Sequence, residues 1–193
     1  GYAAKGTIKI NFTPEDLAAE FFPEKSVDAV ADARDITFEY LPGFPLVEKM
    51  NGIAHFTATT VKVEGSGGSL MTGTKINHAV LWCPELNSLN NPMEATVDLT
   101  APATDAVTML ALKHFPFDDK FGLNAATIRG TVDASLKLKF NAFSGKPNSN
   151  PNEIHLEAVD YDIATTLTNV AQENVYGGYN ARAINGTLKA DTK

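Results

Sequence analysis

An unbroken alternation of apolar and polar residues over positions 127–140 limits the choice of fold more than any other feature of the chain. Every even position from Ile128 to Phe140 is apolar or glycine, and every odd position from Arg129 to Lys139 is polar. This period of two predicts an antiparallel strand with one dry and one wet face. It would be about 45 Å long, roughly two to three times the usual strand. Its dry face needs cover, either from the domain core or from a ligand.

The same alternation recurs along the chain, whereas helix signals occur at only two places. One short helix is predicted from Pro14 to Phe21 or Phe22, after an N-cap at Thr13, and a second begins at Thr104-Asp105. No βαβ rhythm is present. The predicted fold is therefore mainly β (α+β), a long, strongly twisted antiparallel sheet with two short helices. Strands are predicted at 6–12, 33–41, 53–64, 70–76, 79–83, 93–99, 127–140, 154–158, 161–163 and 184–190.

Four local predictions refine this pattern. Asn51-Gly52 is a turn signal, and the change of apolar phase near Thr59-Thr60 implies a bulge or a turn. The continuous apolar run at 79–83 indicates a segment buried on both sides. Within it, Cys83 is interpreted as a small buried hydrophobe rather than a nucleophile.

The bulk composition disfavours several classes of partner. The 193-residue chain has a formal charge of −7, and its sixteen Lys and Arg residues form no run, so a nucleic-acid partner is not expected. No stretch of about 18 apolar residues exists, and the N-terminus does not read as a signal peptide. The length allows one large domain or one and a half repeats of a smaller unit.

The motifs that would support catalysis, a cofactor or a metal are not found. Residues 68–75 approach a phosphate loop, but the Gly-Lys-Ser/Thr order is inverted and no helix is expected behind them. No Gly-x-Ser-x-Gly elbow occurs. The acids at 118–119 and 160–162 are interpreted as solvated turns rather than a calcium site. The histidines lack the spacing of zinc ligands, and none is assigned a role: His55, His78, His114 and His155.

Taken as a series, several segments resemble the AsmA-like periplasmic envelope proteins, in the YhdP/TamB-type branch of bridge-like lipid transfer proteins. Phe44-Pro45 stands where that family usually has Trp-Pro. The resemblance divides the chain into a β-rich unit at 1–143, a loop or linker at 144–152, and the start of a second similar unit at 153–193 on the same sheet. The segments that carry it are 35–40, 42–46, 52–56, 61–63 with Gly73, 109–116 and 130–138.

This resemblance implies a non-enzymatic periplasmic module of a Gram-negative envelope protein, whose inner-membrane anchor lies outside the fragment. A trough-like sheet would hold acyl chains of phospholipid or another lipid while they move between the inner and outer membranes. The alternative is a structural or assembly β-domain with a closed core and no ligand. The groove candidates, each of which reads equally as ordinary core, are Phe38, Tyr40, Phe56, Val97, Leu99, Ile128, Val132, Leu136, Leu138 and Phe140.

Overall fold

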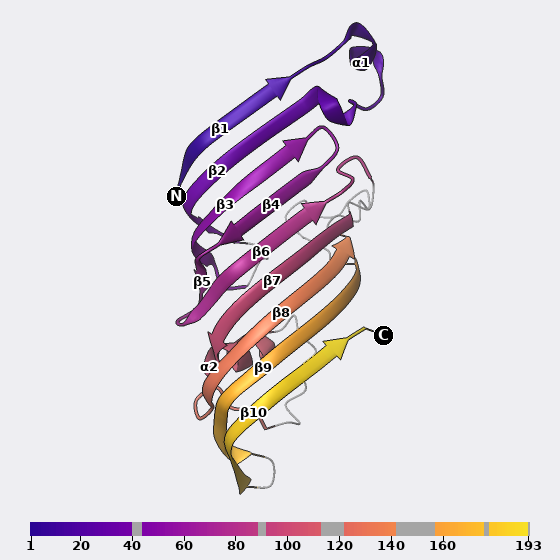
Figure 1. Ribbon diagram of the computed structural model, residues 1–193. Helices are drawn as coiled ribbons and strands as arrows, with labels where there is room; N and C mark the ends of the chain where they lie inside the picture. Colours follow the sequence, from indigo (N-terminus) through magenta and orange to yellow (C-terminus); the bar gives the residue numbers. More distant parts are fainter. Residues whose placement is uncertain (40–43, 89–91, 113–121, 142–156, 176–177, 193) are drawn as a thin grey trace.

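The computed structural model describes residues 1–39, 44–88, 92–112, 122–141, 157–175 and 178–192 (Figure 1). These residues form one antiparallel sheet of ten strands with two short α-helices, which confirms the predicted mainly β fold. A 3₁₀ turn at Glu24–Ser26 precedes the second strand. The elements are β1 (Tyr2–Ile10), α1 (Pro14–Ala18), β2 (Val27–Phe38), β3 (Val47–Thr57), β4 (Val61–Ser66), β5 (Gly68–Leu70), β6 (Thr74–Cys83), β7 (Pro92–Pro102), α2 (Ala103–Leu110), β8 (Arg129–Asn141), β9 (Glu157–Val175) and β10 (Tyr179–Asp191).

The sheet is a twisted single layer whose strands follow almost the order of the chain (Figure 1). The spatial order is β1-β2-β3-β4-β6-β7-β8-β9-β10, and the short β5 pairs with β3 and β6 beside this path. Consecutive strands can pair antiparallel through short connections, which is why alternating segments in series give a meander. Strands β1 and β10 form the two edges of the sheet.

The strand that was predicted from the longest alternation is β8, which covers 13 residues, Arg129–Asn141. It pairs with β7 on one side and with β9 on the other. The strand predicted at 161–163 and the described end of the one predicted at 154–158 belong to a single strand, β9, which runs from Glu157 to Val175, whereas 154–156 lie outside the described residues. The sequence hides this length because the ladder between β8 and β9 contains a register shift between Lys139 and Asn141, opposite 157–160, and such a bulge changes the phase of the apolar residues.

The helix start at Pro14 is confirmed. Thr13 forms a capping box with Asp16, in which the Thr13 Oγ1 accepts from the Asp16 amide at 3.2 Å and an Asp16 carboxylate oxygen accepts from the Thr13 amide at 2.8 Å. The helix ends at Ala18, earlier than predicted. Its side chains find no buried position, so little packing energy supports further turns.

The predicted turn at Asn51-Gly52 is wrong, because both residues lie inside β3. The Asn51 Oδ1 accepts a hydrogen bond from the amide of Asp35, a bulged β2 residue with φ of 52°. A Cβ at Gly52 would lie 2.9 Å from the carbonyl oxygen of Glu64 in β4. Asn51 therefore satisfies the amide of a bulge in β2, and Gly52 allows the backbone of β4 to approach closely. The turn expected near Thr59-Thr60 is confirmed, since β3 ends at Thr57 and β4 begins at Val61.

The single strand predicted at 70–76 is also wrong. β5 ends at Leu70 and β6 begins at Thr74, with a turn between them. The side chain of Asp105 determines this turn, because its two oxygens accept four hydrogen bonds from Thr72, Gly73 and Thr74 at 2.9–3.0 Å. An interaction across more than 30 residues cannot be read from local pattern.

Helix α2 begins at Ala103, and Pro102 occupies the N-cap position without a side-chain cap. The predicted N-cap at Thr104-Asp105 is therefore off by two residues, and the Asp105 carboxylate is used for the β5–β6 turn instead. Asp105 is only 4% exposed. In Figure 1 the helix lies behind the sheet, close to the start of β8.

The segment 79–83 belongs to β6 and is not buried on both sides. Residues 79–82 are half-buried, and Cys83 alone among them is buried, at 3% exposure. The prediction for Cys83 is confirmed. The prediction that this segment is buried on both sides is wrong because the sheet is one layer thick, so one face of β6 meets solvent.

Two clusters of buried side chains stabilise the same end of the sheet, where β3, β6 and β8 begin. The first cluster lies under α2 and joins Ala103, Val107, Ile128, Val132 and Val170. The second lies under the β5–β6 turn and joins Val47, Met50, Leu70 and Ile76. The predicted linker at 144–152 lies outside the described part of the chain, and the domain boundaries stay predictions. No described helix is long and apolar enough to cross a membrane.

Candidate functional site

Apolar residues of the long strands form continuous rows on one face of the sheet. Residues that pair directly across antiparallel strands point to the same side, so the register assembles them into rows that cross the strands. We call this side the apolar face. Its first row is Ala33, Gly52, Gly65, Ala79, Val97, Leu136, Ile163 and Ala190, and its second row is Gly6, Ala31, Ala54, Val63, Leu81, Ala95, Leu138 and Tyr161.

Each row crosses eight strands without a charged side chain. With strands about 4.8 Å apart, eight strands span roughly 34 Å. The hydrocarbon core of a bilayer is about 30 Å thick, so each row is about twice as long as the depth of one leaflet. An extended acyl chain could lie along it across the strands.

The opposite face is polar, as the row that interleaves the two apolar rows demonstrates. Two of its eight members are apolar, and five are charged. Alternation within each strand therefore separates a wet face from a dry one across the whole sheet. The members of this row are Asp32, Ile53, Glu64, Val80, Thr96, Lys137, Asp162 and Asp191.

Among the described residues, protein covers the apolar face at one end and leaves it open toward the other. Helix α2 and the two buried clusters cover the end at which β8 begins. Toward the other end, Ile8 is 71% exposed and Phe56 is 38% exposed. The chain as a whole exposes 12715 Å², whereas a compact monomer of 20.7 kDa exposes about 8,900 Å². The chain therefore exposes more surface than a compact monomer of its mass.

Seven of the ten predicted groove residues lie on the apolar face. Val97 and Leu136 belong to the first row and Leu138 to the second. Leu99 pairs with Ala134 in a neighbouring row, nearer α2. The other three, placed by their partners on adjacent strands, are Phe56, Val132 and Phe140.

Val132, and two of the three predicted residues not yet placed, do not belong to the open part of the apolar face. Ile128 and Val132 are 5% and 8% exposed and pack against α2, so protein already covers them. Phe38 lies beyond the Asp35 bulge of β2 and pairs with Val47 of the second cluster. Tyr40 lies outside the described residues.

Sequence reasoning missed the small residues of the two rows. Six of the seven members in β1 to β4 are alanine or glycine, and such small residues carry a weaker apolar signal than Leu and Phe. The signal was present in β2, where Ala29, Ala31 and Ala33 alternate with Asp28, Val30 and Asp32. Because these side chains are small, the layer of side chains on the apolar face is thinner over β2 and β3 than over β7 and β8.

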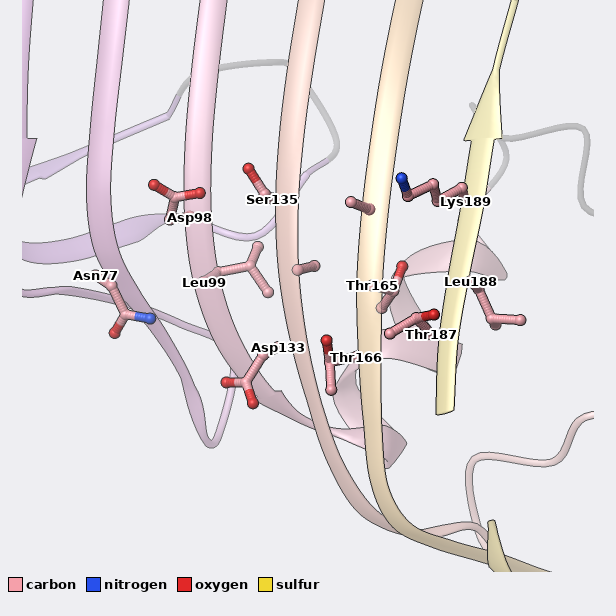
Figure 2. A pocket seen from close by; sticks show the side chains of 12 residues that line it. Asn77, Asp98, Leu99, Asp133, Ser135, Thr165, Thr166, Thr187, Leu188 and Lys189 are labelled. Carbon is pink, nitrogen blue, oxygen red and sulfur yellow. The ribbon is translucent and has the colours of Figure 1, made fainter. Parts of the chain in front are cut away.

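A separate shallow depression of about 370 Å³ occurs over β6 to β10 (Figure 2). Asp98, Asp133, Ser135 and Lys189 surround it, and these side chains belong to the polar face, with α2 behind the strands. Asp133 already accepts a 2.6 Å hydrogen bond from Thr100. The depression is open, and none of its side chains forms a nucleophile and base pair. Its chemistry is that of a solvated surface.

The described histidines lie within hydrogen-bond distance of exposed carboxylates on the polar face. His55 Nε2 lies 2.9 Å from an Asp28 carboxylate oxygen, and this hydrogen bond holds the pKa of Asp28 below its ordinary value. His78 likewise lowers the pKa of Glu64 from 3.2 Å, with help from Lys62. Among the placed residues, no three His, Cys, Asp or Glu side chains gather as metal ligands would.

No family model, curated protein or solved structure matches the chain. The apolar face therefore has to be interpreted from its own geometry.

Proposed function

We propose that this chain is a non-enzymatic module that holds acyl chains of phospholipid, or of another acyl lipid, along the apolar face. The observation that carries the proposal is the pair of apolar rows, each continuous over eight strands and covered by the described residues only near α2 and the β5–β6 turn. A large unpartnered apolar surface on a soluble protein marks a binding site for protein, membrane or ligand.

The shape of the surface favours a chain-like ligand. The rows extend across the strands, so a ligand that fills them must be long, narrow and apolar. Covering about 200 Å² of apolar surface would contribute about 5 kcal/mol. That affinity holds a lipid while leaving exchange possible, as transfer between membranes requires. On this proposal the module works in the periplasm of an inner-membrane-anchored envelope protein, and its anchor lies elsewhere.

A second candidate is the structural β-domain with a closed core. The two buried clusters favour it, since Ile128, Val132 and Met50 are covered by protein without any ligand. The two candidates differ in what meets the surface from Val97 to Phe140. A lipid module needs hydrocarbon there, whereas a structural domain needs only the protein itself.

Photocrosslinking at neighbouring positions of β8 separates the candidates. A photoreactive phenylalanine analogue replaces Leu138, on the apolar face, or Lys137, one residue away on the polar face. Each purified full chain is mixed with vesicles that contain radiolabelled phospholipid, irradiated and analysed on a gel. We expect labelling at 138 and background at 137, because adjacent strand residues face opposite sides. Equal labelling at the two positions, or none at either, contradicts the lipid module.

Lipid extraction from the purified chain provides a second measurement. Mass spectrometry should find co-purified phospholipid in the unmodified chain and less of it in the variant Leu136→Asp, which places a carboxylate in the first row. The matched control, Ser135→Asp, adds the same charge to the polar face. A structural domain would yield clean protein in all three samples.

A further inference from the structure

The hairpins β2–β3 and β9–β10 are copies of one structural unit, 134 residues apart. Each pair of the first hairpin has an equivalent in the second at that separation. Ala33 pairs with Gly52, and Leu167 pairs with Gly186. Two of the equivalences lie beyond the bulge: Ile36–Met50 with Val170–Ile184, and Phe38–Val47 with Gln172–Ala181.

The unusual backbone positions repeat as well. Asp35 and its equivalent Asn169 have φ of 52° and 51°, in the left-handed region that most residues avoid. In each hairpin an asparagine one strand away accepts a hydrogen bond from that amide. The distance is 3.2 Å from Asp35 to Asn51 and 2.9 Å from Asn169 to Asn185.

The hairpins differ in what lies beyond them. β3 pairs on its outer side with β4 and β5, whereas β10 has no partner on that side within the described chain. A Cβ at Gly52 would lie 2.9 Å from the Glu64 carbonyl oxygen of β4. At Gly186 the same Cβ would meet nothing within 4 Å. Glycine weakens a strand and often marks a position where another backbone approaches closely. Gly186 therefore leaves room for the backbone of a further strand beside β10.

The buried side chain next to this position gives the same indication. Met50 is 6% exposed because Gly65 of β4 and Gly68 of β5 leave room for it against their backbone. Its equivalent Ile184 is 43% exposed. The edge of β10 contains no proline, one of the devices by which proteins block further pairing.

We propose that the free edge of β10 binds an antiparallel β-strand of the β4–β5 type. Such a strand has apolar residues at alternate positions followed by two glycines, and it takes the register that β4 and β5 take on β3. It would cover Ile184, pack its backbone on Gly186 and extend the first row of the apolar face by one strand. The proposal stands on the internal repeat and is independent of lipid binding.

Disulfide capture of a peptide tests the predicted register. The peptide is residues 59–71 of this chain, which include β4 and β5, and the protein is the full chain with Cys83→Ala and Lys189→Cys. Because His55 pairs with Lys62, position 189 should face position 62. We expect a Lys62→Cys peptide to form the mixed disulfide about tenfold faster than a Val63→Cys peptide, since a one-residue slip turns the thiol to the other face. Equal rates, or no capture by either peptide, overturn the proposal.

Hydrogen exchange of the unmodified chain provides a measurement that needs no cysteine. The unaltered peptide should slow exchange of the outward amides over 184–190, and a Lys62→Pro peptide, which lacks an amide donor that would face β10, should slow it less. Unchanged exchange at saturating peptide overturns the proposal. Protection that rises with protein concentration alone also overturns it, because a second copy of the chain would then occupy the edge.

Discussion

Replacing Asp105 by alanine should loosen the end of the sheet that α2 covers. The Asp105 carboxylate is 4% exposed and accepts hydrogen bonds from Thr72, from the amide of Gly73, and from both the amide and hydroxyl of Thr74. Thr74 is itself 5% exposed, so its two donors would lose their acceptor inside the protein. An unsatisfied buried donor costs about 1–3 kcal/mol.

The two Thr74 donors alone therefore predict a loss of about 2–6 kcal/mol in the free energy of unfolding. For a chain of this size that corresponds to a fall in Tm of roughly 4–24 °C. Equilibrium urea unfolding, followed by far-UV circular dichroism, measures the loss. The matched control is Asp133→Ala, because Asp133 also accepts from a threonine of another strand, Thr100, but at an exposed position.

The control should lose less than about 1 kcal/mol, because water can replace an exposed acceptor. Binding of a dye specific for apolar surface should rise in Asp105→Ala and stay constant in Asp133→Ala. Of these two aspartates, Asp105 is the one that connects α2 to the β5–β6 turn. If the two variants lose the same stability, the buried carboxylate does not hold this end of the sheet together.

Two further predictions concern β3 and its neighbours. Gly52→Ala should lower the free energy of unfolding by about 1–3 kcal/mol, because its Cβ would lie 2.9 Å from the Glu64 carbonyl oxygen, whereas Gly6→Ala has 3.8 Å of clearance and should be close to neutral in the same urea titration. The carboxyl of Asp28 should titrate below its ordinary pKa by NMR, and His55→Ala should raise that pKa. Because folding depresses the Asp28 pKa, its stabilising contribution is present above the unfolded pKa and is lost as pH falls through the folded one; an unchanged midpoint in His55→Ala would contradict the pairing.

The fold class and several strands could be predicted because alternation is a local property. Side chains of a strand must point to opposite faces, so the pattern from Ile128 to Phe140 revealed β8 directly. The prediction failed where a bulge changed the phase, as in β9, or where a local signal had a distant use. Asn51 looked like a turn residue, yet its side chain satisfies the amide of Asp35.

The candidate site could be predicted only in part. The large residues of β7 and β8 attracted attention, and register places Val97, Leu136 and Leu138 on the apolar face. The alanines and glycines of β2 to β4 could not be assigned to the site, because the role of a small side chain depends on which residues lie next to it in the folded sheet. Ile128 and Val132 belong to the same alternation as Leu136, but α2 folds over them.

The amino-acid sequence by itself determined which side chains of each strand share a face, since backbone geometry imposes a period of two. Tertiary structure decided how those faces align, where α2 lies and which apolar residues stay exposed. The reason is that pairing register, the Asp105 contacts and the repeat of the β2–β3 hairpin in β9–β10 all depend on hydrogen bonds between residues distant in the chain. Local pattern gives each strand a dry side, and only long-range pairing joins those sides into one surface.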